Sequence, residues 1–297
     1  MKTILIICFS FCTAGLQAQY FYNDIIGTQE INRQMKNYVD KKVRTVTATG
    51  FDQRGARQTD FTEVQEVKEN GTLLRVSTIN SFKKTVLYSK FDSQGRVIRT
   101  TDSSSAVNNV ATYSYNAEGR LSRIENITRD SANDFNQVET HQWIYGSNGQ
   151  PVKMWRTINN QDSLEVRFKP DDNGYPGDER SYKKGVETGQ YYYMLDEKNQ
   201  PTYVQTGAIY YYYDDRNRLT DVVRFNLKAA RLLPDLLFEY DDNDLVIQKI
   251  TTSTNASIGY LTWRYIFSDK QLKTKEVLFN KEKKITGRIE YHYTFGN

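Results

Sequence analysis

The unit that decides this fold is written most clearly at residues 113–121, which read Tyr-Ser-Tyr-Asn-Ala-Glu-Gly-Arg-Leu. The two tyrosines are two positions apart, so both rings lie on one face of a strand. Asn116 accepts hydrogen bonds from the amides that follow it and opens a type I turn. Gly119 supplies the left-handed residue that ends such a turn. Leu121 resumes the apolar pattern, so the unit predicts a β-hairpin closed by a tight turn with a G1 bulge.

The same unit recurs along most of the chain, and its leading aromatic or apolar residue is here called the anchor. Successive anchors are on average about 23 residues apart, which is within the range typical of repeat architectures. An arginine follows the turn in three copies (Arg96, Arg120 and Arg218), and we expect it to pair with turn carboxylates or to form a solvated rim rather than to bind nucleic acid. The anchors are Phe51, Val67, Phe91, Tyr115, Tyr145, Phe168, Leu195, Tyr213, Tyr240, Phe267 and Phe279.

The repeats predict an all-β chain with a single repeat domain over residues 50–297. Successive antiparallel hairpins would form a twisted, curved or partly closed sheet. Residues 19–49 differ and are predicted to be a leader and a cap. Apolar residues recur there at helical spacing, which predicts a short helix at about 28–40 with Thr28 as its N-cap. We expect this helix to cover the exposed first edge of the sheet.

Residues 1–18 read as a secretory signal peptide with cleavage near Ala18. A basic start precedes an apolar run of about 14 residues, whereas about 20 are needed to span a bilayer. Cys8 and Cys12 both lie in this segment, so the mature chain would have no disulfide. An exported chain without disulfides favours a bacterial source. We therefore expect a periplasmic or extracellular protein that does not span the membrane.

Position by position, the unit reads Tyr-x-Tyr-Asp-x-x-Gly-Arg-Leu, which resembles the YD repeat of the RHS family. The best copies are residues 113–121 and 211–219, and degenerate copies extend over about residues 50–295. The resemblance implies the hairpin unit and a curling sheet. RHS proteins carry many more repeats, a core-protease segment and a toxin domain. No such segment is recognised in this sequence, so encapsulation and toxin delivery are not implied.

The composition offers few reactive groups. Among 297 residues there are two His and two Cys, and 40 Lys and Arg nearly balance 36 Asp and Glu. This argues against zinc or thiol chemistry and against a nucleic-acid partner. His141 and His292 are expected to be structural, the latter facing solvent from the last strand. We predict no catalytic residue, no cofactor and no metal ion.

Paired carboxylates such as Asp171 and Asp172 occupy the repeated turn, where Asp has a local hydrogen-bonding role. A glycosidase works with two carboxyl groups about 5 to 9 Å apart. A carbohydrate-active enzyme that uses Asp171 and Asp172 as such a pair is therefore an alternative. A structural envelope protein is a second alternative.

The 22 Tyr and 14 Phe residues raise the question of a ligand surface. Runs of adjacent tyrosines place rings on both faces of their strands, where they either fill a two-sided core or stack on a ligand. The leading hypothesis is an exported, non-enzymatic binding protein with a glycan or protein partner. An apolar barrel lumen would instead indicate a lipid carrier, and the oligomeric state is open. The candidate ligand residues are Trp143, Trp155, Tyr192, Tyr211, Tyr212 and Trp263.

Overall fold

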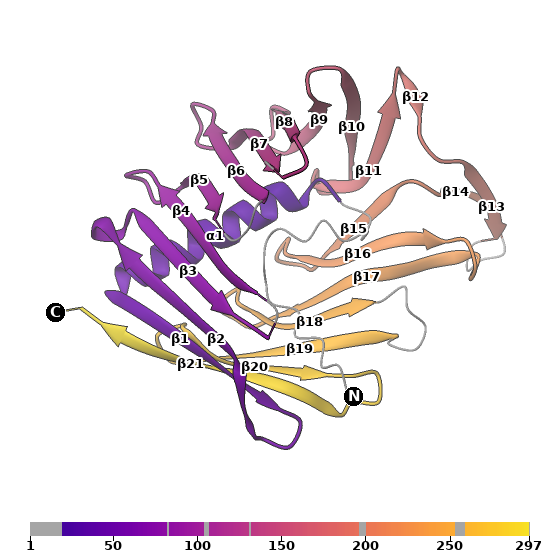
Figure 1. The fold of residues 1–297 in the computed structure, drawn as a ribbon. Coiled ribbons are helices and arrows are strands. Elements are labelled where there is room, and N and C mark those ends of the chain that lie inside the picture. Colours follow the sequence, from indigo (N-terminus) through magenta and orange to yellow (C-terminus); the bar gives the residue numbers. More distant parts are fainter. Residues whose placement is uncertain are drawn as a thin grey trace.

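The computed structural model describes residues 20–296 except 82, 104–106, 131, 196–199 and 253–258, so the expected signal peptide and both cysteines lie outside the described residues. The predicted all-β architecture with an N-terminal helix is confirmed (Figure 1). The helix is α1 (Asn23–Asp40), and a 3-10 turn η1 (Glu69–Gly71) separates the second and third strands.

The strands of the first half are β1 (Val43–Asp52), β2 (Arg57–Lys68), β3 (Leu73–Ile79), β4 (Lys84–Phe91), β5 (Val97–Asp102), β6 (Val107–Tyr115), β7 (Leu121–Asp130), β8 (Phe135–Tyr145), β9 (Pro151–Ile158), β10 (Asp162–Pro170) and β11 (Pro176–Lys183). Those of the second half are β12 (Val186–Glu187), β13 (Tyr191–Leu195), β14 (Pro201–Gln205), β15 (Ile209–Tyr213), β16 (Leu219–Asn226), β17 (Arg231–Tyr240), β18 (Val246–Thr252), β19 (Tyr260–Phe267), β20 (Lys273–Phe279) and β21 (Ile285–Phe295).

The main sheet closes on itself as an antiparallel barrel, where the sequence had predicted a twisted, curved or at most partly closed sheet. The described strands form one sheet of 19 strands, in which β21 pairs with β1 along its whole length. Strands β12 to β14 stand outside the ring: β12 pairs only with β11, and β13 and β14 form a separate two-stranded sheet. The ring continues from β11 directly to β15 through the pairs at Asp178 and Glu179. The first strand, β1, begins at Val43, so the sheet starts within residues 19–49, which were expected to form only a leader and a cap.

The turn of the repeat unit has the predicted conformation. In the β4–β5 hairpin, the Asp92 carboxylate accepts hydrogen bonds from the amides of Gln94 and Arg96. Gly95 has φ +75°, and the register shifts by a bulge at Phe91. Together these contacts form the type I turn with a G1 bulge. The left-handed residue stands at the same place in other copies at Gly119, Gly149, Asn217, Asp244 and Gln271.

Neighbouring repeats are tied together by their anchors and arginines. The Tyr115 hydroxyl donates to the carbonyl of Val97 in the preceding repeat at 2.7 Å. The guanidinium of Arg96 lies 4.6 Å from the Tyr115 ring centre and also pairs with the turn carboxylate of Asp92, as Arg218 does with Asp214. A tyrosine at the anchor thus combines a cation–π contact with a hydrogen bond that phenylalanine could not form. The same pairing joins Arg120 to Tyr145 and Arg218 to Tyr240.

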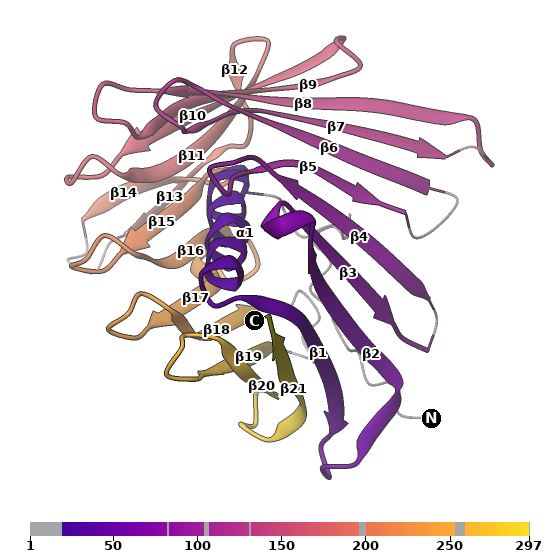
Figure 2. The same cartoon turned by 90° about the vertical axis from the view of Figure 1, so that its left-hand side faces the viewer.

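The helix differs from the prediction in its start and in its role. It begins at Asn23, five residues before the expected N-cap, and Thr28 lies inside it with its hydroxyl donating to the Asp24 carbonyl. The expected covering of a sheet edge is wrong, because the closed ring leaves no first edge. Instead, α1 lies within the ring of strands (Figure 2).

Two apolar clusters hold α1 against opposite parts of the wall. Near its start, Phe21 and Tyr22 pack with Trp143 and Phe168 of β8 and β10. Near its end, Met35 and Tyr38 pack with residues from β1, β3, β4 and the turn before β20, including Val46. The core therefore forms between the helix and the barrel wall. Turn backbones add polar contacts, since Arg33 donates to the carbonyl of Asp244 and Asn37 to that of Gln271.

Candidate functional site

The structure buries three of the six predicted ligand residues, Trp143, Tyr211 and Trp263. The Trp143 ring stacks on Phe168 at 5.4 Å between centres, and the Tyr211 ring meets Tyr22 edge to face at 5.2 Å. Trp143 and Tyr211 pack in the core between the barrel wall and α1, whereas the adjacent Tyr212 is exposed, so this core is one-sided and not the two-sided core that the sequence offered as an alternative. The three buried side chains offer no surface to a ligand that approaches from outside.

A buried carboxylate holds the start of α1. Glu179 of β11 is 2% exposed, and its two oxygens accept hydrogen bonds from the amides of Phe21 and Tyr22, both at 3.1 Å. The Tyr211 hydroxyl donates to the same carboxyl at 2.6 Å. Burial raises the pKa of Glu179 to about 7, although these hydrogen bonds partly oppose that rise. Glu179 thus satisfies backbone donors at the helix start, in place of the expected side-chain N-cap.

A charged chain of side chains ties α1 to β8 and β9. His141 is 2% exposed, and its Nδ1 lies 2.6 Å from Asp24 Oδ2 while its Nε2 lies 2.9 Å from Glu139 Oε1. Burial alone would lower the pKa of His141, but the two carboxylates outweigh it and raise the pKa to about 9. The imidazolium therefore donates to both partners at neutral pH. Arg156 donates to Glu139 at 2.7 Å. A histidine held in its charged form between two acids serves as a tie and is poorly suited to general base catalysis.

The other end of the helix also faces polar groups. The Tyr38 hydroxyl donates to Gln65 Oε1 at 2.9 Å, and Gln65 Nε2 donates to Glu63 at 2.9 Å. Glu276, which is buried, pairs with Lys273. The inner wall therefore mixes charged and apolar groups around α1. The interior is therefore not the apolar lumen that would have indicated a lipid carrier.

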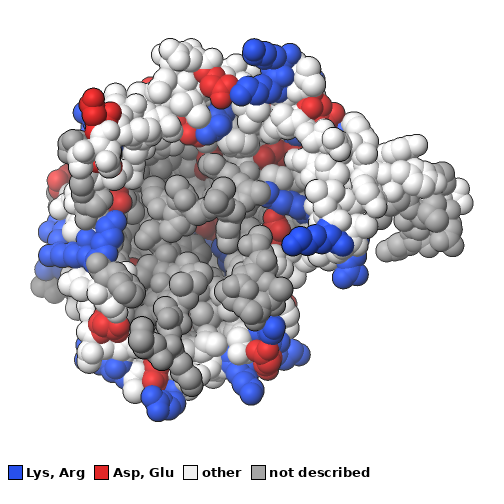
Figure 3. Space-filling view, turned by 45° about the vertical axis from the view of Figure 1, so that its right-hand side comes forward, with Lys and Arg blue, Asp and Glu red and all other residues white. Residues whose placement is uncertain are grey.

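The outer wall carries rows of ion pairs along its strands. Acidic and basic side chains are interspersed on the face seen in Figure 3. A pair in which both side chains are exposed stabilises the fold by at most about 1 kcal/mol, whereas the carboxylates of Glu165 and Asp178 are buried beneath their partners. The pairs include Arg75 with Glu66, Arg123 with Glu125, Arg167 with Glu165, Arg180 with Asp178, and Arg288 with Glu290.

An exposed aromatic surface lies on the hairpin of β13 and β14, which projects from the barrel in Figure 1. We call Tyr191, Tyr192, Tyr193 and Tyr203 the hairpin surface. Three of its rings are strongly exposed: Tyr191 by 59%, Tyr193 by 55% and Tyr203 by 67%. Tyr193 and Tyr203 are cross-strand partners whose rings meet at 5.5 Å, and Tyr192 packs on Phe225 of β16 at 4.8 Å. The surface is thus anchored to the barrel on one side and open to solvent on the other.

The other three predicted ligand residues, Tyr192, Tyr212 and Trp155, are exposed but do not lie on one surface. Tyr212 is on β15, which pairs with β16, the strand on which the hairpin rests. Trp155 is on β9, separated from β15 by β10 and β11, and its ring lies 5.8 Å from the Lys153 ammonium. Only Tyr192 of the predicted set belongs to the hairpin surface. The signal for its other members was present in the run 191–193, because adjacent residues of a strand point to opposite faces and cannot all be buried on one side.

The paired acids serve the turns, as the sequence predicted. Asp171 Oδ1 accepts hydrogen bonds from the amides of Asn173 at 3.0 Å and Tyr175 at 2.8 Å. Within the described residues, no three His, Cys, Asp or Glu side chains converge in a metal-binding group. No helix in the same part of the chain has the length and apolar character needed to cross a membrane. His292 is exposed, as expected, and His141 is structural in its contacts.

Comparisons with solved structures give matches of low score. The crystal structure of TcdB2-TccC3-TEV has 13% identity and a TM-score of 0.32, covering 81% of this chain and 15% of that one. A porin-like protein from Bacteroides uniformis has 10% identity and a TM-score of 0.37, covering 86% and 97% of the two chains. For a porin-like protein from Bacteroides vulgatus the values are 12%, 0.28, 85% and 98%. No family model and no curated protein matches the sequence.

Proposed function

We propose that this protein is exported and acts by binding, with the hairpin surface as its contact for a glycan. One observation carries the proposal: four tyrosines gather on a hairpin that stands outside the closed barrel, and three of them are more than half exposed. A folded domain seldom leaves such an aromatic group in water without a use. Tyrosine combines a flat apolar ring with a hydroxyl, which suits stacking on a sugar.

Polar groups beside the rings support a sugar ligand. The Tyr191 hydroxyl donates to Glu187 at 3.1 Å and accepts from Arg180 at 3.2 Å. A carboxylate and a guanidinium next to exposed rings can exchange these bonds for bonds to sugar hydroxyls. The barrel interior is a less suitable site, because α1 occupies it and charged pairs line it.

A binding role fits the titratable groups better than catalysis does. Asp171 is committed to its turn, and His141 is buried between two carboxylates. In neither place is a proton acceptor free to act on a substrate. The alternative of a carbohydrate-active enzyme that uses Asp171 and Asp172 predicts hydrolysis of the bound glycan, which product analysis by mass spectrometry would detect.

Titration calorimetry with neutral hexasaccharides such as cellohexaose and xylohexaose tests the proposal. Losing one stacked ring costs about 1 kcal/mol, so Tyr193→Ala and Tyr203→Ala should each weaken binding about fivefold. Phe135→Ala is the matched control, since Phe135 is an exposed aromatic residue at the start of β8. Absence of binding across a broad glycan array, or equal affinity in all variants, would refute the hairpin surface as the site. Export is checked separately by sequencing the mature N-terminus, which should begin at Gln19.

A further inference from the structure

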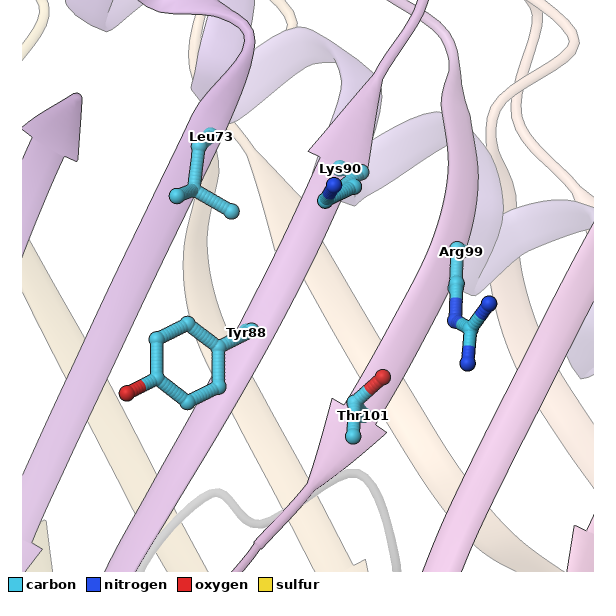
Figure 4. Close-up of a pocket in the computed structure, with 5 residues that line it drawn as sticks. All are labelled: Leu73, Tyr88, Lys90, Arg99 and Thr101. Carbon is cyan, nitrogen blue, oxygen red and sulfur yellow. The ribbon is translucent and has the colours of Figure 1, made fainter. Parts of the chain in front are cut away.

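A second surface feature is a hollow on the outer wall with a volume of about 300 Å³. Five side chains from three neighbouring strands line it: Leu73 from β3, Tyr88 and Lys90 from β4, and Arg99 and Thr101 from β5 (Figure 4). This volume is at the lower end of the range for small-molecule sites. The hollow is on the wall of the first half of the chain, away from the hairpin surface.

The register places the lining side chains in two rows across the strands. Leu73, Lys90 and Arg99 are direct partners in one row. Tyr88 and Thr101 are partners in the next row, two residues along β4. Side chains two residues apart on a strand share a face, so both rows look outward together. The hollow therefore has a charged row beside a row with an aromatic ring and a hydroxyl.

Among the described residues, the charged row has no carboxylate partners, unlike another outer-wall row of opposed cations formed by Lys153, Arg167 and Arg180. Lys90 and Arg99 are directly opposite each other, and like charges in that position destabilise a sheet. Neither forms an ion pair with a carboxylate anywhere in the described part of the chain, whereas many other outer-wall cations do. The neighbouring Glu66 on β2 already pairs with Arg75 and, at 3.2 Å, with Lys68. In the described part of the chain, no carboxylate therefore offsets the like charges of Lys90 and Arg99.

We propose that this hollow binds an acidic sugar residue. Its carboxylate or sulfate would lie between Lys90 and Arg99, where the guanidinium can donate two parallel hydrogen bonds. Its ring would stack on Tyr88 above Leu73, and Thr101 would hydrogen-bond a hydroxyl. Each polar side chain of the lining carries a donor and none is a carboxylate, which matches a ligand rich in acceptors. This site stands independently of the hairpin surface, because it uses other strands and a charged ligand.

Titration calorimetry on the full mature chain, at low and at moderate salt, tests the assignment. The probes are trigalacturonic acid, its methyl ester, a sulfated trisaccharide, triglutamate and sodium phosphate. The acidic trisaccharides should bind, and more weakly as salt increases. Lys90→Gln and Arg99→Gln should each weaken binding at least tenfold, as expected for a lost charged hydrogen bond. Lys84→Gln is the matched control, because it removes the same charge from the far end of β4 and should leave the affinity unchanged.

Unfolding of the unliganded variants provides a second measurement. Relief of the like-charge pair should leave Lys90→Gln at least as stable as the parent chain, so weakened binding cannot be ascribed to misfolding. The preference between the uronate and the sulfated probe identifies which anion the site takes. Equal binding of the acid and its neutral ester, equal effects of Lys84→Gln and Lys90→Gln, or phosphate or triglutamate binding as tightly as the acidic sugar would each overturn the proposal. Failure of neutral glycans to bind the hairpin would leave this site unaffected.

Discussion

The tie between α1 and the barrel wall should make the stability of this protein depend on pH in a defined window. His141 has a folded-state pKa of about 9 against an ordinary value near 6.5. A tenfold change in proton affinity corresponds to about 1.4 kcal/mol, so the tie contributes about 3 kcal/mol to the free energy of unfolding. Because the pKa is raised on folding, this contribution is fully present below about pH 6.5. It declines as the pH rises and is lost above about pH 9.

The perturbation that isolates this effect is His141→Gln. Glutamine keeps a polar side chain but cannot carry the charge, so Asp24 loses its cation while Glu139 keeps Arg156. We expect the variant to be about 3 kcal/mol less stable at pH 6 and to approach the parent chain at pH 9 to 10. Urea denaturation followed by tyrosine and tryptophan fluorescence at one-unit pH steps measures both curves.

The matched control is His292→Gln, because His292 is exposed on the outer face of β21. It should leave the free energy of unfolding within about 0.5 kcal/mol of the parent at every pH. Glu179 also titrates near this window: its raised pKa gives a contribution that is present below about pH 4.5 and lost through pH 7. That loss is common to parent and variant and cancels in their difference. A difference between parent and His141→Gln that stays constant from pH 6 to 9 would refute the charged tie.

Two further predictions concern the repeat unit. Tyr115→Phe removes the hydroxyl that donates to Val97 and should cost about 1 kcal/mol in urea denaturation; an unchanged midpoint would mean that this bond adds nothing to the coupling of repeats. Gly149→Ala and Gly95→Ala should each cost about 1–2 kcal/mol, because both glycines have φ near +80°. The cost should be greater at Gly149, where the new methyl group would lie 2.7 Å from the Arg120 guanidinium, while at Gly95 the space is open; equal costs would contradict this expectation.

The repeat unit could be predicted from the sequence because its hydrogen bonds are local. Asp92 bonds to amides two and four residues later, and Gly95 closes the turn within the same segment. Residue types alone therefore specify the geometry. The outward position of His292 followed from the same strand alternation. Local patterns of this kind do not depend on how many hairpins the sheet contains.

The closure and the place of the helix could not be predicted, because they depend on contacts between distant residues. Glu179 binds the amide of Phe21 from 158 residues away, and nothing near either residue indicates the partner. The inner wall is also partly polar, so strands facing α1 do not alternate cleanly between apolar and polar residues. Buried groups such as Gln65 and Glu276 read as surface residues in the sequence. The charged row at Lys90 and Arg99 was missed for a related reason, since its members meet only through strand register.

Barrel size gives a physical reason for the helix inside the ring. About eight strands enclose a space that their own side chains fill, and larger rings leave an open interior. A ring with more than twice that number of strands needs another element to complete its core, and α1 contributes Phe21 and Tyr22 to one cluster and Met35 and Tyr38 to the other. The ion pairs of His141 and the Glu179 carboxyl add directional contacts between the helix and the wall to these apolar ones. Because α1 fills the interior, both proposed ligand sites lie outside the ring of strands: the hairpin surface on its separate two-stranded sheet and the Lys90–Arg99 row on the outer wall.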